Sequence, residues 1–148
     1  MKMTFRWYGK DDPVKLEQIR QIPLMSGVVA AIYNVPAGEV WPREEIAILK
    51  NTVNDAGLEF EVVESVPVHE SIKLGLEERD RLIGNYCENI NRLGEAGVKV
   101  ICYNFMPVFD WLRSDLAVKL PDGSSALSYD NSKVLSMNPL KSELSLPG

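Results

Sequence analysis

Four short runs of apolar residues, rich in β-branched side chains, constrain the fold of this chain more than any other feature. They cover residues 3–8, 27–33, 58–66 and 98–105. Runs that are apolar along most of their length are typical of parallel sheets, because the strands of such sheets are buried on both faces. The four runs therefore predict four strands of a parallel sheet.

Helical patterns separate these runs. Residues 14–19 predict a short helix, with a proline near its start. A second helix is predicted from Pro42, where two glutamates follow, to the stop signal at Gly57. A third carries apolar residues at helical spacing between positions 82 and 93. The order is βαβαβαβ, which predicts an α/β protein with right-handed crossovers.

The composition argues against two classes of partner. Apolar residues make up 45% of the chain and charged residues 25%, the balance of a globular protein. A net charge of -5 disfavours nucleic acid, whose phosphates are bound by Lys and Arg. The sequence has no run of about 18 apolar residues and no signal-peptide pattern at its start. We therefore expect a cytoplasmic protein that binds neither nucleic acid nor membrane.

The pattern changes after the fourth run. Residues 106–116 are mixed and aromatic, and residues 121–125 form a turn sequence. From residue 128 onward Asn, Ser, Lys and Pro dominate, without periodicity. We expect the strands of βα units one to four within residues 1–105 and a loop-rich extension over residues 106–148.

Five stretches of the chain resemble the bacterial, metal-dependent mannonate dehydratases of sugar-acid catabolism. They are residues 1–9, 19–23, 35–42, 64–75 (ESVPVHESIKLG) and 102–111. The resemblance runs to about residue 130. It implies a lyase with a (βα)8 TIM barrel, which uses Mn²⁺ or Fe²⁺ to dehydrate D-mannonate to 2-keto-3-deoxygluconate. It also implies a homo-oligomer.

The length of the chain limits what it can do alone. Eight βα units usually need about 250 residues, and the 148 residues here supply about four units. We therefore expect residues 1–148 to be the N-terminal half of one TIM-barrel domain, continued in a longer chain or completed by a partner. The resemblance implies His, Cys and Asp metal ligands in the second half, so none is expected here and all are expected downstream of Gly148.

Dehydration of a sugar acid defines which side chains the site needs. A base removes the proton beside the carboxylate, and an acid protonates the departing β-hydroxyl. A divalent metal stabilises the enediolate, and cationic or hydrogen-bonding groups hold the carboxylate and the polyol. In a βα barrel these groups lie at the carboxyl ends of the strands. The sequence does not identify the general base.

This positional rule selects six residues as candidates for substrate binding: Arg6, Trp7, Tyr8, His69, Asn104 and Asp110. Arg6 suits a carboxylate but equally suits a structural ion pair, and Trp7 either walls the pocket or joins the core. His69 is the only histidine, with a substrate contact or a structural role as its alternatives. Asn104 either binds a hydroxyl or fixes its loop. Asp110 contacts substrate or a neighbouring subunit.

Two other functions remain open. A related metal-dependent barrel of the sugar-isomerase or endonuclease type would share strand order and metal use, although the net negative charge argues against DNA. A non-catalytic or truncated α/β module would bind a partner or a sugar acid without turnover. Metal-ligand codons downstream, in frame, would exclude that module. Nucleotide binding is unsupported, because the chain has no glycine-rich phosphate loop.

Overall fold

A computed structural model of the chain describes residues 1–107 and 113–136. The chain divides into two compact units, residues 1–105 and residues 106–148. Within the described ranges, no helix is long and apolar enough to cross a membrane.

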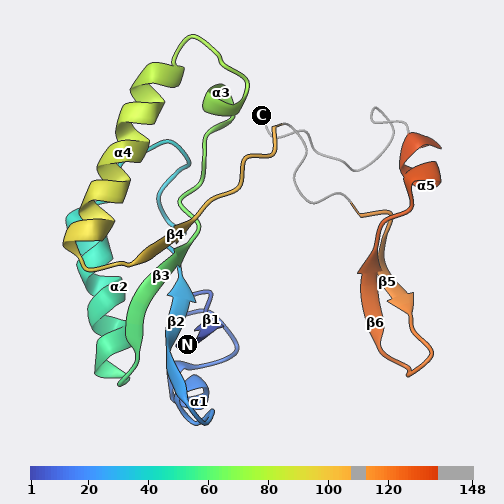
Figure 1. Cartoon of the computed structure of the whole chain (residues 1–148), viewed down its shortest axis with the longest axis horizontal. Coiled ribbons are helices and arrows are strands. Elements are labelled where there is room, and N and C mark those ends of the chain that lie inside the picture. The colour runs from blue at the N-terminus through green and yellow to red at the C-terminus, as the bar shows by residue number, and fades with distance from the viewer. Residues whose placement is uncertain (108–112, 137–148) are drawn as a thin grey trace. The chain divides into compact units, whose positions relative to one another are not determined.

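The first unit is built on a four-stranded parallel sheet (Figure 1). Its strands lie in the order β1 (Met3–Arg6), β2 (Met25–Ala30), β3 (Glu59–Glu64) and β4 (Val100–Cys102). All three neighbouring pairs are parallel, which confirms the predicted sheet. The strands end earlier than predicted. The apolar runs continue past the strand ends because some of their residues are buried in the loops that follow. Ile32, for example, is 7% exposed but lies after β2.

Helices connect the strands as predicted. They are α1 (Leu16–Arg20), α2 (Arg43–Asp55) and α4 (Arg79–Glu95). The predicted stop of α2 is confirmed, because Gly57 follows its last turn with φ of +75°, a conformation that glycine adopts at little cost. A four-residue helix, α3 (Glu70–Lys73), lies in the loop after β3. It is too short to show a helical period in the sequence.

The hydrophobic core lies between the sheet and the helices. Val28, Phe60 and Val63 of the sheet belong to one buried cluster with Val53 of α2 and Leu93 of α4. Figure 1 shows both helices on the same side of the strands. Burial of each such side chain contributes about 1.5–3 kcal/mol. This packing holds the carboxyl ends of the strands in place.

A row of valines crosses the opposite face of the sheet. Val29 of β2 pairs with Val62 of β3, which pairs with Val100 of β4. Their neighbours Val28 and Val63 are buried in the core, so alternation along the strands directs the row away from α2 and α4. Val100 is 50% exposed. The row of valines is therefore open to solvent at its β4 end.

The second unit contains an antiparallel hairpin and a short helix. Strands β5 (Asp115–Lys119) and β6 (Ser125–Ser128) pair across a turn, in which Leu120 N–H donates to the Ser124 carbonyl at 2.9 Å. Helix α5 (Asn131–Ser136) follows. The turn was predicted, whereas the two strands beside it and α5 were not. Leu116, Val118 and Leu120 alternate along β5 and just after it, but β6 carries one large apolar residue, Leu127, so the pattern is short.

Candidate functional site

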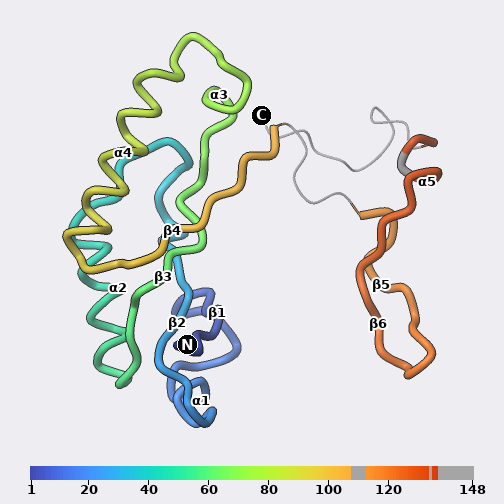
Figure 2. Tube along the Cα trace, viewed as in Figure 1, coloured from blue at the N-terminus to red at the C-terminus, as the bar shows by residue number. Residues whose placement is uncertain are grey.

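The loops after the strands meet at the carboxyl edge of the sheet, because all four strands are parallel. Figure 2 follows one of them, residues 31–42, from β2 to α2. This segment is called the β2–α2 loop below. Its first residues, 31–34, line a cleft of about 460 Å³ together with residues 7–11 and one side of α2.

Arg6 lies at the end of β1 and contacts the end of β3. Its Nη1 donates to the backbone carbonyl of Glu64, and the Glu64 carboxylate lies 3.9 Å away. The Arg6 Cζ is 4.8 Å from the centroid of the Tyr8 ring, a cation–π distance. The structural ion pair considered for Arg6 is therefore present. A guanidinium has five N–H donors, and these contacts use only part of them.

Trp7 and Tyr8 have different surroundings. Trp7 is 4% exposed and belongs to the core, although it also borders the cleft. Its indole Nε1 is buried and has no hydrogen-bond partner among the described residues. An unpaired buried donor costs about 1–3 kcal/mol, so an acceptor at this nitrogen would be stabilising. Tyr8 is 61% exposed, and its ring centroid lies 6.4 Å from that of Tyr33.

Asp12 fixes the loop after β1, and the sequence analysis missed it. Its carboxylate is buried and accepts hydrogen bonds from the backbone N–H of Tyr8 at 2.7 Å and of Val14 at 2.9 Å. These bonds, first of all the one from Tyr8, hold the pKa of Asp12 below its usual range. Aspartate often forms a turn by accepting a hydrogen bond from the backbone N–H two residues later. The pair Asp12-Pro13 is such a turn signal in the sequence.

Replacing Asp12 by asparagine should destabilise the protein at neutral pH and have a smaller effect in acid. A carboxyl whose pKa is lowered on folding stabilises the protein above its unfolded pKa, and that contribution is lost as pH falls through the folded pKa. The difference between the two proteins is therefore largest above about pH 4. Urea unfolding at pH 7 and near pH 3 measures it, with exposed Asp11→Asn as control. An equal difference at both pH values would contradict this role.

His69 caps α3. Its Nδ1 accepts a hydrogen bond from the Ser71 backbone N–H at 3.1 Å, so a neutral ring carries its proton on Nε2. The Ser71 hydroxyl donates to Glu78 at 2.8 Å. The structural role considered for His69 is thus present, and Nε2 is the atom through which the ring can also bind a ligand. The sequence did not reveal this cap, because α3 itself was not predicted.

Asn104 is not joined to this group. Asn104 is exposed after β4, and no hydrogen bond or ion pair links it or His69 to Arg6 within the described ranges. A second, apolar cleft of about 470 Å³ includes its neighbours Tyr103 and Phe105. Asp110 lies outside the described residues.

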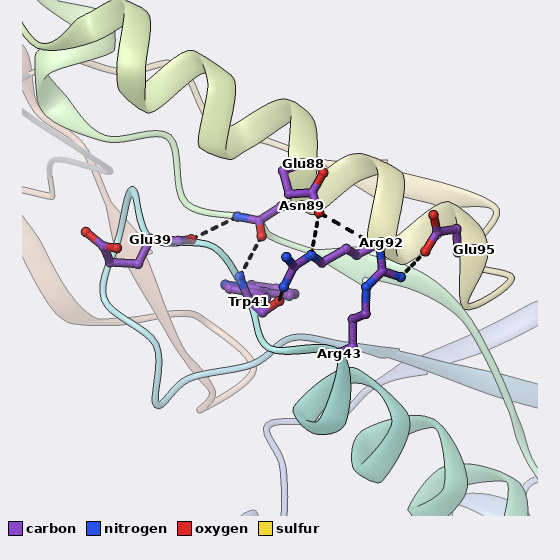
Figure 3. Close-up of polar contacts among 7 residues, drawn as sticks. All are labelled: Glu39, Trp41, Arg43, Glu88, Asn89, Arg92 and Glu95. Carbon is purple, nitrogen blue, oxygen red and sulfur yellow. Dashed lines mark hydrogen bonds and ion pairs between the residues drawn. The ribbon is translucent and has the colours of Figure 1, made fainter.

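Three side chains of α4 hold the β2–α2 loop, and none of them was among the predicted site residues. Figure 3 shows two of them, Asn89 and Arg92. Asn85 donates to the Gly38 carbonyl at 2.8 Å. Asn89 donates to the Glu39 carbonyl at 3.0 Å and accepts from the Trp41 N–H at 2.7 Å. Arg92 donates to the Trp41 carbonyl at 2.9 Å. Their spacing places them on one face of the helix, a signal that could have been read from the sequence.

A divalent metal ion needs several donor side chains close together. Residues 1–107 and 113–136 contain no group of three or more His, Cys, Asp or Glu side chains able to hold a metal ion. The described side chains therefore do not form a site for the divalent ion that the resemblance implies.

Comparison with known proteins bears on the whole chain. The family model for D-mannonate dehydratase (UxuA) matches residues 1–146. Mannonate dehydratases from Streptococcus uberis and Streptococcus pneumoniae are 62% and 56% identical to the chain over all 148 residues. The chain covers 42% and 40% of these two proteins. It therefore spans about two fifths of the length of such relatives.

A solved structure is similar to this chain in both fold and sequence. The crystal structure of mannonate dehydratase from Streptococcus suis serotype 2 superposes with a TM-score of 0.90 at 57% identity. The match covers 95% of this chain and 40% of that one. Sequence and fold thus agree along nearly the entire length, and the chain belongs to the D-mannonate dehydratase (UxuA) family.

Proposed function

We propose that this chain is the N-terminal half of a metal-dependent mannonate dehydratase, which converts D-mannonate to 2-keto-3-deoxygluconate. The observation that carries the proposal is the match over residues 1–146 to the family, joined to relatives that bear this name at 56–62% identity. The reaction would be that of the complete polypeptide, since the chain covers only about two fifths of those relatives.

The open side of the sheet supports a (βα)8 TIM barrel. Strands β1 and β4 lie at the edges of the four-stranded sheet, and each has a single strand partner there. The valines Val29, Val62 and Val100 lie on the face opposite the helices, where a barrel places the side chains that fill its interior. Four further βα units would pair with both edges and bury this row. Residues 1–148 would then form part of one domain.

The carboxyl edge of the sheet would bind the sugar acid. Arg6 would hold the substrate carboxylate, since a planar guanidinium matches a carboxylate in two parallel hydrogen bonds. His69 would donate from Nε2 to a substrate oxygen, because its Nδ1 is already occupied by Ser71. Tyr8 and Trp7 would wall the pocket, with Asn104 as a further polar contact. Metal ligands and the general base would come from residues downstream of Gly148.

Removal of the metal provides the first test. In the complete polypeptide, a strong chelator should abolish dehydration of D-mannonate, and added Mn²⁺ or Fe²⁺ should restore it, since the ion stabilises the enediolate. The product is followed as a 2-keto acid. Chelator already saturated with Mn²⁺ has no free capacity, so it serves as the control and should leave the enzyme active. Full turnover after exhaustive chelation would contradict the metal requirement, and an isomerised sugar acid as product would contradict the reaction.

A further inference from the structure

The β2–α2 loop is bonded to α4 and packs against His69, a residue of the proposed substrate site. It leaves the sheet at the carboxyl end of β2 and is bound at Gly38, Glu39 and Trp41 by polar side chains of α4. Figure 3 shows the contacts at Glu39 and Trp41. All of these contacts are made to backbone atoms of the loop. The position of the loop therefore depends on α4 rather than on packing of the loop's own side chains alone.

Asn89 is the central residue of this attachment. It is 2% exposed, and its amide both donates to Glu39 and accepts from Trp41. Truncation of Asn89 would leave a carbonyl and an N–H of the loop without their partner inside the protein. A shorter or apolar side chain cannot replace both bonds. The loop would then shift to regain partners from water.

The same loop touches His69 through Gly38. A Cβ placed on Gly38 would lie 3.1 Å from Cδ2 of the His69 ring and 2.7 Å from Cδ2 of Leu82. Gly38 has φ of +86°, which also favours glycine there. The backbone of the loop thus packs closely against one edge of the imidazole. The bond from Ser71 to Nδ1 holds the ring from its other side.

We propose that Asn89 is a positioning residue for His69. It acts through the β2–α2 loop: Asn89 and Asn85 hold the loop against α4, and Gly38 of that loop limits where the imidazole can lie. Its effect on the reaction rests on the proposed function, in which His69 Nε2 binds the sugar acid. Its effect on the position of His69 does not depend on that function.

Asn89→Ala in the complete polypeptide tests the proposal with two readouts. The first is hydrogen exchange at the Ser71 amide, which is bonded to His69 Nδ1, and at the Trp41 amide, which is bonded to Asn89. Both should exchange at least about tenfold faster, as expected when a bonded amide opens more often. The second is turnover of D-mannonate, where KM should rise about tenfold and kcat should change less.

Two variants complete the design. Asn85→Ala removes one bond to the loop and leaves Asn89 in place. It should therefore raise amide exchange and KM in the same direction as Asn89→Ala, but less. This variant keeps the proposal testable if Asn89→Ala does not fold. Asn91→Ala is the matched control, an exposed asparagine on the same helix, and should leave both readouts unchanged. Faster exchange at Trp41 with an unchanged Ser71 amide would overturn the proposal, because the loop would then not position His69.

The two ideas fail in different ways. If His69→Ala leaves KM unchanged, the substrate contact of His69 is wrong, and the Ser71 amide still decides whether Asn89 positions the ring. If Asn89→Ala and His69→Ala each raise KM, the double variant should be no worse than His69→Ala alone. Independent, multiplying effects would show that Asn89 does not act through His69.

Discussion

Replacing Trp41 by alanine should lower the free energy of unfolding by about 3–5 kcal/mol, the largest loss expected from a single change in the first unit. Trp41 is 1% exposed and belongs to the core cluster. Its backbone is held on both sides by Asn89 and Arg92, so the loop cannot easily collapse into the space that the indole leaves. Since domains are stable by only about 5–15 kcal/mol, this change removes a large part of the total.

Urea unfolding of the wild type and the variant measures this loss. Ile48→Ala is the control, because Ile48 lies on α2 with 59% of its surface exposed and should change stability by no more than about 0.5 kcal/mol. A loss below about 1 kcal/mol for Trp41→Ala would mean that the core relaxes around the cavity, and would contradict the packing described for this loop.

Replacing Arg6 by lysine should raise KM for D-mannonate about 10- to 100-fold in the complete enzyme. A hydrogen-bonded contact to a charged group is worth about 1.5–3 kcal/mol, and each 1.4 kcal/mol corresponds to a factor of ten. Lysine keeps the charge but loses the planar fork that matches a carboxylate. It also loses the fixed contact of Arg6 with the Glu64 carbonyl, which orients the guanidinium.

Steady-state kinetics of Arg6→Lys and of a control separate binding from a general loss of fold. Arg20→Lys is suited as control, because Arg20 is exposed at the end of α1, ahead of the amino end of β2. It should leave both KM and kcat unchanged. An unchanged KM in Arg6→Lys would mean that Arg6 serves only the ion pair with Glu64, and would remove it from the proposed substrate site.

The sheet and its main helices could be predicted because their signals are local. The apolar run at residues 27–33 and the stripe from 82 to 93 each report their own periodicity, and both elements are present as β2 and α4. Strand ends were less accurate. Ile32 continues the apolar run and therefore looks like a strand residue in the sequence. In the structure it is buried in the loop after β2.

The arrangement of the candidate site could be predicted only in part. The rule that selected Arg6 and Tyr8 follows from parallel topology alone, and these two side chains do contact each other. The cap formed by His69 and the bonds from Asn89 to the β2–α2 loop depend on residues distant in sequence or on an element too short to recognise. The β5–β6 hairpin was missed although Leu116, Val118 and Leu120 alternate, because this pattern is short and β6 contains one large apolar residue, Leu127.

Turnover of D-mannonate tests the central claim most directly. It should be measured in parallel for residues 1–148 alone and for the complete polypeptide that carries this segment at its N-terminus, both with Mn²⁺. We expect 2-keto-3-deoxygluconate from the complete polypeptide and none from residues 1–148, whose described part contains no metal site. Dehydration by residues 1–148 alone, or no dehydration by the complete polypeptide, would contradict this claim.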